Sequence, residues 1–140
     1  MIKGEGAIRN LLSAFAALAL AAPAPAAAQR EPEWRAAPEA EILLHPFIYE
    51  PSVIRLDAGR PVRLHFVNNG RATLSFSAPA FFRAARVRGR DARALSGGSL
   101  RLAPGERRTV ALVPAAGRYR ARSANLTHRL RGMSALIVVE

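Results

Sequence analysis

Short runs of alternating apolar and polar residues dominate the chain after residue 40. The clearest run is 61–67, in which Val62, Leu64 and Phe66 share one face while Arg63 and His65 share the other. This two-residue period is typical of a strand with one buried face. Similar runs, each ended by turn residues, predict further strands at 41–44, 53–56, 73–76, 100–102, 108–113, 118–123 and 135–139.

Strong turn signals separate these runs, as in Asn68-Asn69-Gly70 and Pro104-Gly105-Glu106. Seven to eight short strands at this spacing predict an all-β fold, a β-sandwich of Greek-key type. Residues 78–95 break the pattern, and we expect a short helix or an irregular insertion there. The chain shows no internal repeat, and its length fits one domain.

The first 28 residues have the layout of a secretory signal peptide. Lys3 and Arg9 form a positive start, residues 11–22 are apolar apart from one serine, and 26–28 are alanines suited to a signal peptidase. The apolar stretch is shorter than the roughly 20 residues that span a bilayer. We therefore expect a periplasmic or secreted protein that is not transmembrane after signal cleavage.

The remaining chain divides into two parts. Residues 29–40 are rich in Glu, Pro and Ala and carry Trp34, the only tryptophan. This composition predicts a flexible lead-in; Trp34 either packs back on the domain or belongs to a loosely held arm. Residues 41–140 form the predicted domain.

Positive charge is in large excess, since 21 Lys and Arg residues face 10 Asp and Glu residues, a net charge of +11. Such a surface favours anionic partners. The predicted insertion contains a concentrated set of arginines, which either docks a protein or an anionic envelope component or forms a solvated surface that keeps the protein soluble. No nucleic-acid partner is expected for an exported protein. The set consists of Arg83, Arg86, Arg88, Arg90 and Arg93.

The chain has no cysteine and only three histidines. No thiolate is therefore available for catalysis or metal binding, and no disulfide can stabilise the domain. The sequence also contains no His-Glu-x-x-His helix, phosphate-binding glycine loop or nucleophile elbow. These observations predict a protein that is not an enzyme.

The C-terminal spacing Ser123-x4-His128-x4-Met133, followed by an apolar strand, resembles the ligand loop of the cupredoxins, small copper-binding sandwich proteins. Three further segments resemble parts of that family in the same order: 51–59, 67–77 and 102–106. The resemblance covers roughly residues 42–140 and implies a cupredoxin-type sandwich.

The resemblance also implies where copper ligands would stand. A blue-copper site uses two His, one Cys and a distant Met. His128 and Met133 stand at two of these positions, but Leu74 stands at the first histidine position and Ser123 at the thiolate position. Leucine cannot bind a metal, and alternation places it inside the sandwich with Phe76. We therefore expect a degenerate copper site.

Two functions follow from this comparison. The first is an exported binding or accessory module that has lost the copper site, acts through its surface and needs no cofactor. The alternative is a periplasmic copper-handling protein that uses His128, Met133 and a third ligand, for which His45 and His65 are the candidates. The alternation favours a solvent-facing His65, and His45 precedes Pro46 near a strand end.

Overall fold

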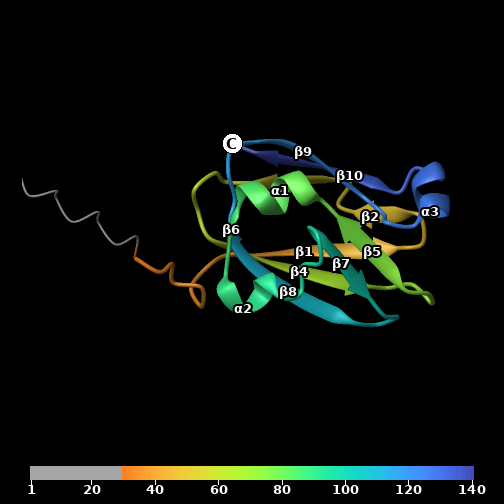
Figure 1. Cartoon of the computed structure of the whole chain (residues 1–140), viewed down its shortest axis with the longest axis horizontal. Coiled ribbons are helices and arrows are strands. Elements are labelled where there is room, and N and C mark those ends of the chain that lie inside the picture. The colour runs from red at the N-terminus through yellow and green to blue at the C-terminus, as the bar shows by residue number, and fades with distance from the viewer. Residues whose placement is uncertain (1–29) are drawn as a thin grey trace, which may run out of the picture. The chain divides into compact units, whose positions relative to one another are not determined.

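The computed structural model describes residues 30–140, which form a sandwich of two five-stranded sheets (Figure 1). The predicted signal peptide and residue 29 of the predicted lead-in lie outside the described residues. The first sheet has the order β2-β1-β4-β8-β6. Its strands are β1 (Glu39–His45), β2 (Ile48–Glu50), β4 (Val62–Asn68), β6 (Arg86–Val87) and β8 (Arg107–Val113).

The second sheet has the order β3-β10-β9-β5-β7. Its strands are β3 (Val53–Leu56), β5 (Leu74–Ser77), β7 (Ser99–Leu102), β9 (Gly117–Arg122) and β10 (Ser134–Val139). Each sheet is mixed, because β1 pairs parallel with β4 and β3 pairs parallel with β10. The predicted all-β sandwich is confirmed.

The core lies between the two sheets and follows the predicted alternation. Phe66 of β4 and Phe76 of β5 are both fully buried, and their ring centroids lie 4.9 Å apart across the sandwich. Burying each large apolar side chain contributes roughly 1.5–3 kcal/mol. All members of the core cluster lie between Ile42 and Val139. In the described part of the chain, the core cluster therefore lies entirely within the predicted domain.

Three short helices complete the described part of the chain: α1 (Pro79–Ala84), α2 (Gly89–Ala92) and α3 (Leu126–Leu130). Pro79 stands at the start of α1, where its missing N–H costs nothing. This helix buries Phe81 and Phe82 against the sandwich, and Phe81 makes an edge contact with Tyr119 at 5.5 Å. The helix predicted within 78–95 is therefore confirmed, and β6 and α2 follow it. No helix in residues 30–140 has the length and apolar character needed to cross a membrane.

The structure adds two strands to the predicted eight. β2 and β6 have three and two residues, too few to show an alternating pattern. The first strand also begins at Glu39, inside the predicted lead-in. Just before it, Ala37 is buried, and the Pro38 carbonyl accepts a hydrogen bond from Arg63 N–H at 2.8 Å.

His65 is buried, and the expectation of a solvent-facing side chain was wrong. Its ring points away from the core as the alternation predicted, but only 9% of the residue is exposed. Nδ1 lies 2.7 Å from Thr109 Oγ1, and Nε2 lies 3.5 Å from Glu39 Oε1 without a hydrogen bond. Side chains from the neighbouring strands β8 and β1 cover the imidazole. The alternation of residues along one strand cannot predict burial by side chains of other strands.

Candidate functional site

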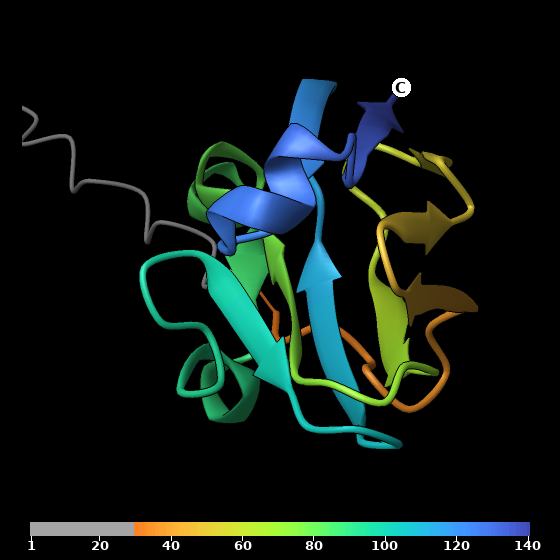
Figure 2. The same cartoon turned by 90° about the vertical axis from the view of Figure 1, so that its right-hand side faces the viewer.

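The loop between β9 and β10 carries three of the four predicted ligand positions. Asn125 caps α3, because its Oδ1 accepts hydrogen bonds from the backbone N–H groups of Thr127 at 2.9 Å and His128 at 3.3 Å. Gly132 then adopts a left-handed conformation with φ +86°, and Met133 N–H donates to the His128 carbonyl at 3.0 Å. Figure 2 shows α3 as the turn of helix at this end of the sandwich.

Ser123 occupies the thiolate position and is part of a polar network. The residue is 1% exposed, and its Oγ accepts a hydrogen bond from Asn125 N–H at 3.2 Å. This oxygen lies 3.3 Å from Ser75 Oγ and 3.5 Å from His128 Nδ1, the latter at the outer limit for a hydrogen bond. Ser75 Oγ in turn accepts from Ala124 N–H at 2.7 Å. The hydroxyls thus join the loop to β5.

Leu74 occupies the first histidine position and packs in the core. It is 2% exposed, begins β5 and pairs with Leu102 of β7. A Cβ atom placed on Gly70 would come within 3.1 Å of Leu74 Cδ1. The surroundings of this side chain are therefore closely packed, as expected for a core leucine.

Asn68 organises the loop before Leu74, a role that the turn motif alone did not indicate. Its Nδ2 donates to the carbonyls of Ala72 and Leu102, both at 2.9 Å, while its Oδ1 accepts from Gly70 N–H at 2.7 Å. The buried amide group of Asn68 thus donates two hydrogen bonds and accepts one, and together they fix the path of the chain into β5.

Met133 and His128 have different environments. Met133 is fully buried in the core cluster. His128 is half-buried, and its ring makes an edge contact with Phe47 at 5.2 Å. Phe47 has φ +68°, and the Arg131 guanidinium lies 4.8 Å from its ring centroid. Sequence reasoning missed Phe47, because an isolated aromatic residue between strands carries no pattern.

The two candidate third ligands make other contacts. His45 Nε2 lies 3.0 Å from Glu50 Oε2, and His65 Nδ1 contacts Thr109. Among residues 30–140, no three His, Cys, Asp or Glu side chains come together in an arrangement that could hold a metal ion.

Tyr49 connects the two sheets beside the polar network. Its hydroxyl donates a hydrogen bond to the Ser75 carbonyl. The residue is 2% exposed, and burial raises the pKa of the phenol because the ionised form would lose its hydration. Tyr49 therefore stays a neutral hydrogen-bond donor in the folded protein.

The arginines of the predicted insertion do not form one free surface. Arg83, Arg90 and Arg93 are exposed, but Arg86 Nη2 lies 3.0 Å from Glu31 Oε2. The Arg88 side chain is mostly buried, with 13% exposed, and its Nε donates to Asp91 Oδ2 at 2.7 Å.

The first described residues lie near this insertion. Trp34 is half-buried, its Nε1 donates to Glu31 Oε1 at 2.8 Å, and it lines a surface hollow together with Arg88 and Arg90. These contacts place the indole against the domain surface.

No family model matches the sequence, and no curated protein matches it. Solved structures do match. Reduced auracyanin from Roseiflexus castenholzii superposes with a TM-score of 0.55 and 18% identity, covering 74% of this chain and 98% of that one. Auracyanin B superposes with a TM-score of 0.53 and 21% identity, covering 74% of this chain and 89% of auracyanin B. Auracyanin A from Chloroflexus aurantiacus, a "blue" copper protein, superposes with a TM-score of 0.50 and 15% identity, covering 73% of this chain and 99% of auracyanin A.

At these identities the likeness concerns the fold alone. The chain has the cupredoxin-type sandwich that the sequence resemblance implied.

Proposed function

We propose that this chain is an exported binding or accessory module with a cupredoxin fold and no type-1 copper site. The observation that carries the proposal is the state of Ser123. Its hydroxyl stands where the resemblance requires a thiolate, and it is engaged with Asn125 N–H and Ser75 Oγ. The position has a structural role in holding the loop to β5.

The donor set does not fit type-1 copper. That site depends on a soft thiolate and two imidazoles, whereas the chain has no cysteine and Leu74 packs in the core. A neutral serine hydroxyl is a hard, weak donor that does not ionise near neutral pH. The proposal therefore assigns the chain no electron-transfer or catalytic step, and its activity is binding through the surface.

The alternative is copper handling by His128 and Met133. It is favoured by one observation: the Met133 N–H to His128 carbonyl hydrogen bond keeps the two residues in one tight turn. Against it, Met133 is fully buried in the core cluster, and His128 Nδ1 faces the Ser123 hydroxyl. A thioether that fills core space is a poor transfer ligand for an incoming ion.

A copper titration separates the two functions. Residues 29–140 are titrated with Cu(I) and Cu(II) against a competing chelator, beside the variants His128→Ala and His45→Ala. His45 is a partly exposed histidine at the end of β1 and a candidate third ligand, so its variant tests a second position. We expect weak binding that neither substitution changes more than the other. Tight stoichiometric binding that His128→Ala abolishes, whether or not His45→Ala also weakens it, would establish the copper-handling alternative instead.

A further inference from the structure

The two sheets differ in how their arginines are neutralised. In the first sheet, every strand arginine has a glutamate within 4 Å: the pairs are Arg63–Glu39, Arg86–Glu31, Arg107–Glu41 and Arg108–Glu106. The five strands of the second sheet contain no acidic residue. Among the described residues, no carboxylate lies within ion-pair distance of their arginines, which are Arg55, Arg101, Arg118, Arg120 and Arg122.

The register places these five exposed arginines on one face, called here the arginine face. Arg118, Arg120 and Arg122 alternate with the inward residues of β9. Directly paired residues on neighbouring strands point to the same side of a sheet. The direct pairs that carry this side across all five strands are Arg55–Val138, Val138–Arg118, Arg122–Ser77 and Ser75–Arg101.

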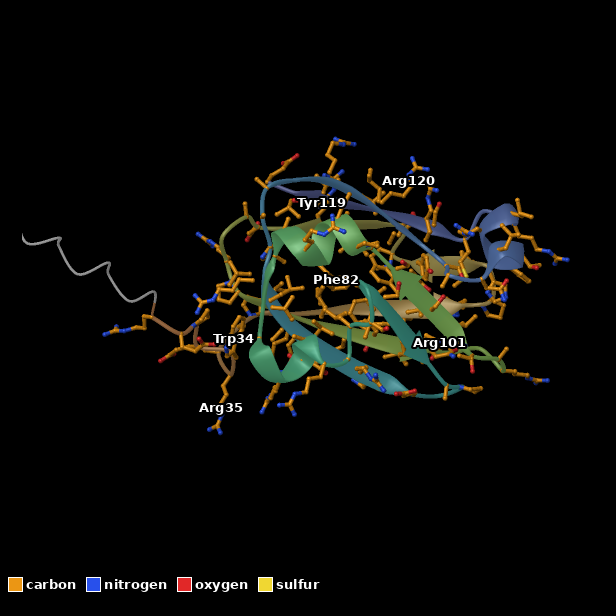
Figure 3. All side chains as sticks on the ribbon, viewed as in Figure 1. Trp34, Arg35, Phe82, Arg101, Tyr119 and Arg120 are labelled. Carbon is orange, nitrogen blue, oxygen red and sulfur yellow. The ribbon has the colours of Figure 1, made fainter. Side chains whose placement is uncertain are left out.

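The arginine face is broad and open. Arg118 to Arg122 spans about 13 Å along β9, and β3 to β7 spans about 19 Å across the sheet, from the ordinary rise and strand spacing. Figure 3 shows Arg120 extending outward from β9, with Arg101 on β7. A recess of about 190 Å³ beside Arg101 is lined by Thr73, Leu74, Ser75, Ala124 and Asn125. Its size allows one small group to contact Arg101.

Positive charges that lack internal partners repel one another across a sheet face. An external anion relieves this repulsion. The planar guanidinium group of each arginine donates pairs of hydrogen bonds that match the oxygens of phosphate.

Exposed leucines lie at one end of the arginine face. The helix α3 connects β9 to β10, and its Leu126 and Leu130 are 60% and 79% exposed. They stand four residues apart on the same side of the turn of helix. Arg129 and Arg131 flank Leu130 in the chain and are both exposed. Aliphatic side chains flanked by cations suit the boundary between lipid headgroups and acyl chains.

We propose that the arginine face and α3 bind the surface of a bilayer that contains anionic phospholipids. The arginines contact phosphate groups, and Leu126 and Leu130 enter the boundary beneath them. An acidic protein would neutralise the arginines but would leave the two leucines unexplained. The inference rests on the proposed function for the role of a binding module, but it does not depend on the state of the copper site.

Vesicle binding tests the proposal. Residues 29–140 are mixed with vesicles of phosphatidylcholine alone or with an equal part of phosphatidylglycerol, and the bound fraction is measured by sedimentation. We expect binding only to the anionic vesicles, weakened by salt. The variant Arg118→Gln/Arg120→Gln/Arg122→Gln should lose affinity on the order of a hundred-fold, since each arginine near an anionic surface contributes roughly five-fold.

The control variant is Arg83→Gln/Arg90→Gln/Arg93→Gln, which removes the same charge from the insertion. It should change affinity by less than about five-fold, the contribution of a single arginine at such a surface. Equal losses in the two triple variants would show that net charge alone drives binding and would overturn the proposal. Circular dichroism confirms that each variant is folded.

A second variant separates lipid from protein. Leu126→Ser/Leu130→Ser should lower vesicle affinity about ten-fold per leucine and leave binding to polyglutamate unchanged. If polyglutamate binds more tightly than the vesicles and the leucine variant binds vesicles normally, the arginine face is a site for an acidic protein and the lipid proposal fails. Tight copper binding in the separate titration would overturn the proposed function, but it would leave the measured vesicle binding and the lipid proposal unaffected.

Discussion

The hydroxyl oxygens of Ser75 and Ser123 lie 3.3 Å apart where β5 meets the end of β9. This contact joins two strands that share only one directly paired position, Ser77 with Arg122. Hydrogen bonds from Ala124 N–H to Ser75 and from Asn125 N–H to Ser123 extend the contact into the loop. Ser123, which stands where the resemblance places a metal ligand, thus helps to hold the loop in place.

If the loop keeps the geometry of a copper site, placing His and Cys at the two positions that differ from the family's ligands should create a copper site. We expect the variant Leu74→His/Ser123→Cys to bind Cu(II) and to show an intense visible absorption band from thiolate-to-copper charge transfer, because it supplies two His, one Cys and one Met. The measurement is a Cu(II) titration followed by absorption spectroscopy.

The single variant Ser123→Cys is the control, since it lacks the second imidazole. It should bind copper more weakly and without a stable band of that kind. A folded double variant that binds no copper would show that the loop has changed its geometry as well as its ligands.

Leu74 should contribute to stability as an ordinary core residue. It is 2% exposed and closely surrounded, so Leu74→Ala should lower the free energy of unfolding by about 2–5 kcal/mol. Leu130, which is 79% exposed, provides the control, and its replacement by Ala should change stability by no more than about 0.5 kcal/mol. Urea denaturation measures both. Equal, small effects would mean that the space around Leu74 is not part of the packed core.

Asp91 should be the most costly ion-pair residue to remove. Its Oδ2 accepts hydrogen bonds from Arg88 Nε at 2.7 Å and from the Ala111 N–H at 2.8 Å, and its side chain is only 11% exposed. Asp91→Ala leaves a mostly buried guanidinium and a buried N–H without partners. We expect a loss of about 3–5 kcal/mol in the free energy of unfolding.

The matched control is the exposed Asp57–Arg60 pair, whose atoms lie 4.0 Å apart with side chains 77% and 79% exposed. Asp57→Ala should cost no more than about 1 kcal/mol. If Asp91→Ala is equally mild in urea denaturation, the carboxylate does not anchor the insertion to β8.

The sandwich and the placement of Leu74 could be predicted from sequence because both depend on a two-residue period. Alternation within 73–76 is enough to place Leu74 and Phe76 on one side, and the structure confirms that both are buried. Spacing along the C-terminal loop similarly placed Ser123, His128 and Met133 within one turn region.

Features that depend on contacts between distant residues could not be predicted in this way. Asp91 is the only acid among five arginines of the insertion, and its partner Ala111 lies twenty residues further on. The cover over His65 comes from Glu39 and Thr109 on two neighbouring strands. The signal peptide and its consequences for location stay predictions.

Tyr49 should make the stability of the protein sensitive to alkaline pH. Burial raises the pKa of its phenol above the ordinary value of 10.0. In the unfolded chain the phenol ionises near that value, whereas in the folded protein it keeps its proton. The unfolded state therefore releases a proton that the folded state retains. The contribution of the neutral phenol is fully present below about pH 10 and declines as the pH rises further.

The variant Tyr49→Phe tests this dependence. Near neutral pH it should lose about 1 kcal/mol of stability with the hydrogen bond to the Ser75 carbonyl. Above about pH 10 its free energy of unfolding should fall less steeply than that of the unmodified protein, because phenylalanine cannot ionise. Urea denaturation at a series of pH values measures both slopes. Parallel slopes would place the alkaline sensitivity in other groups, and Tyr49 would then serve only as the hydrogen-bond link between β2 and β5.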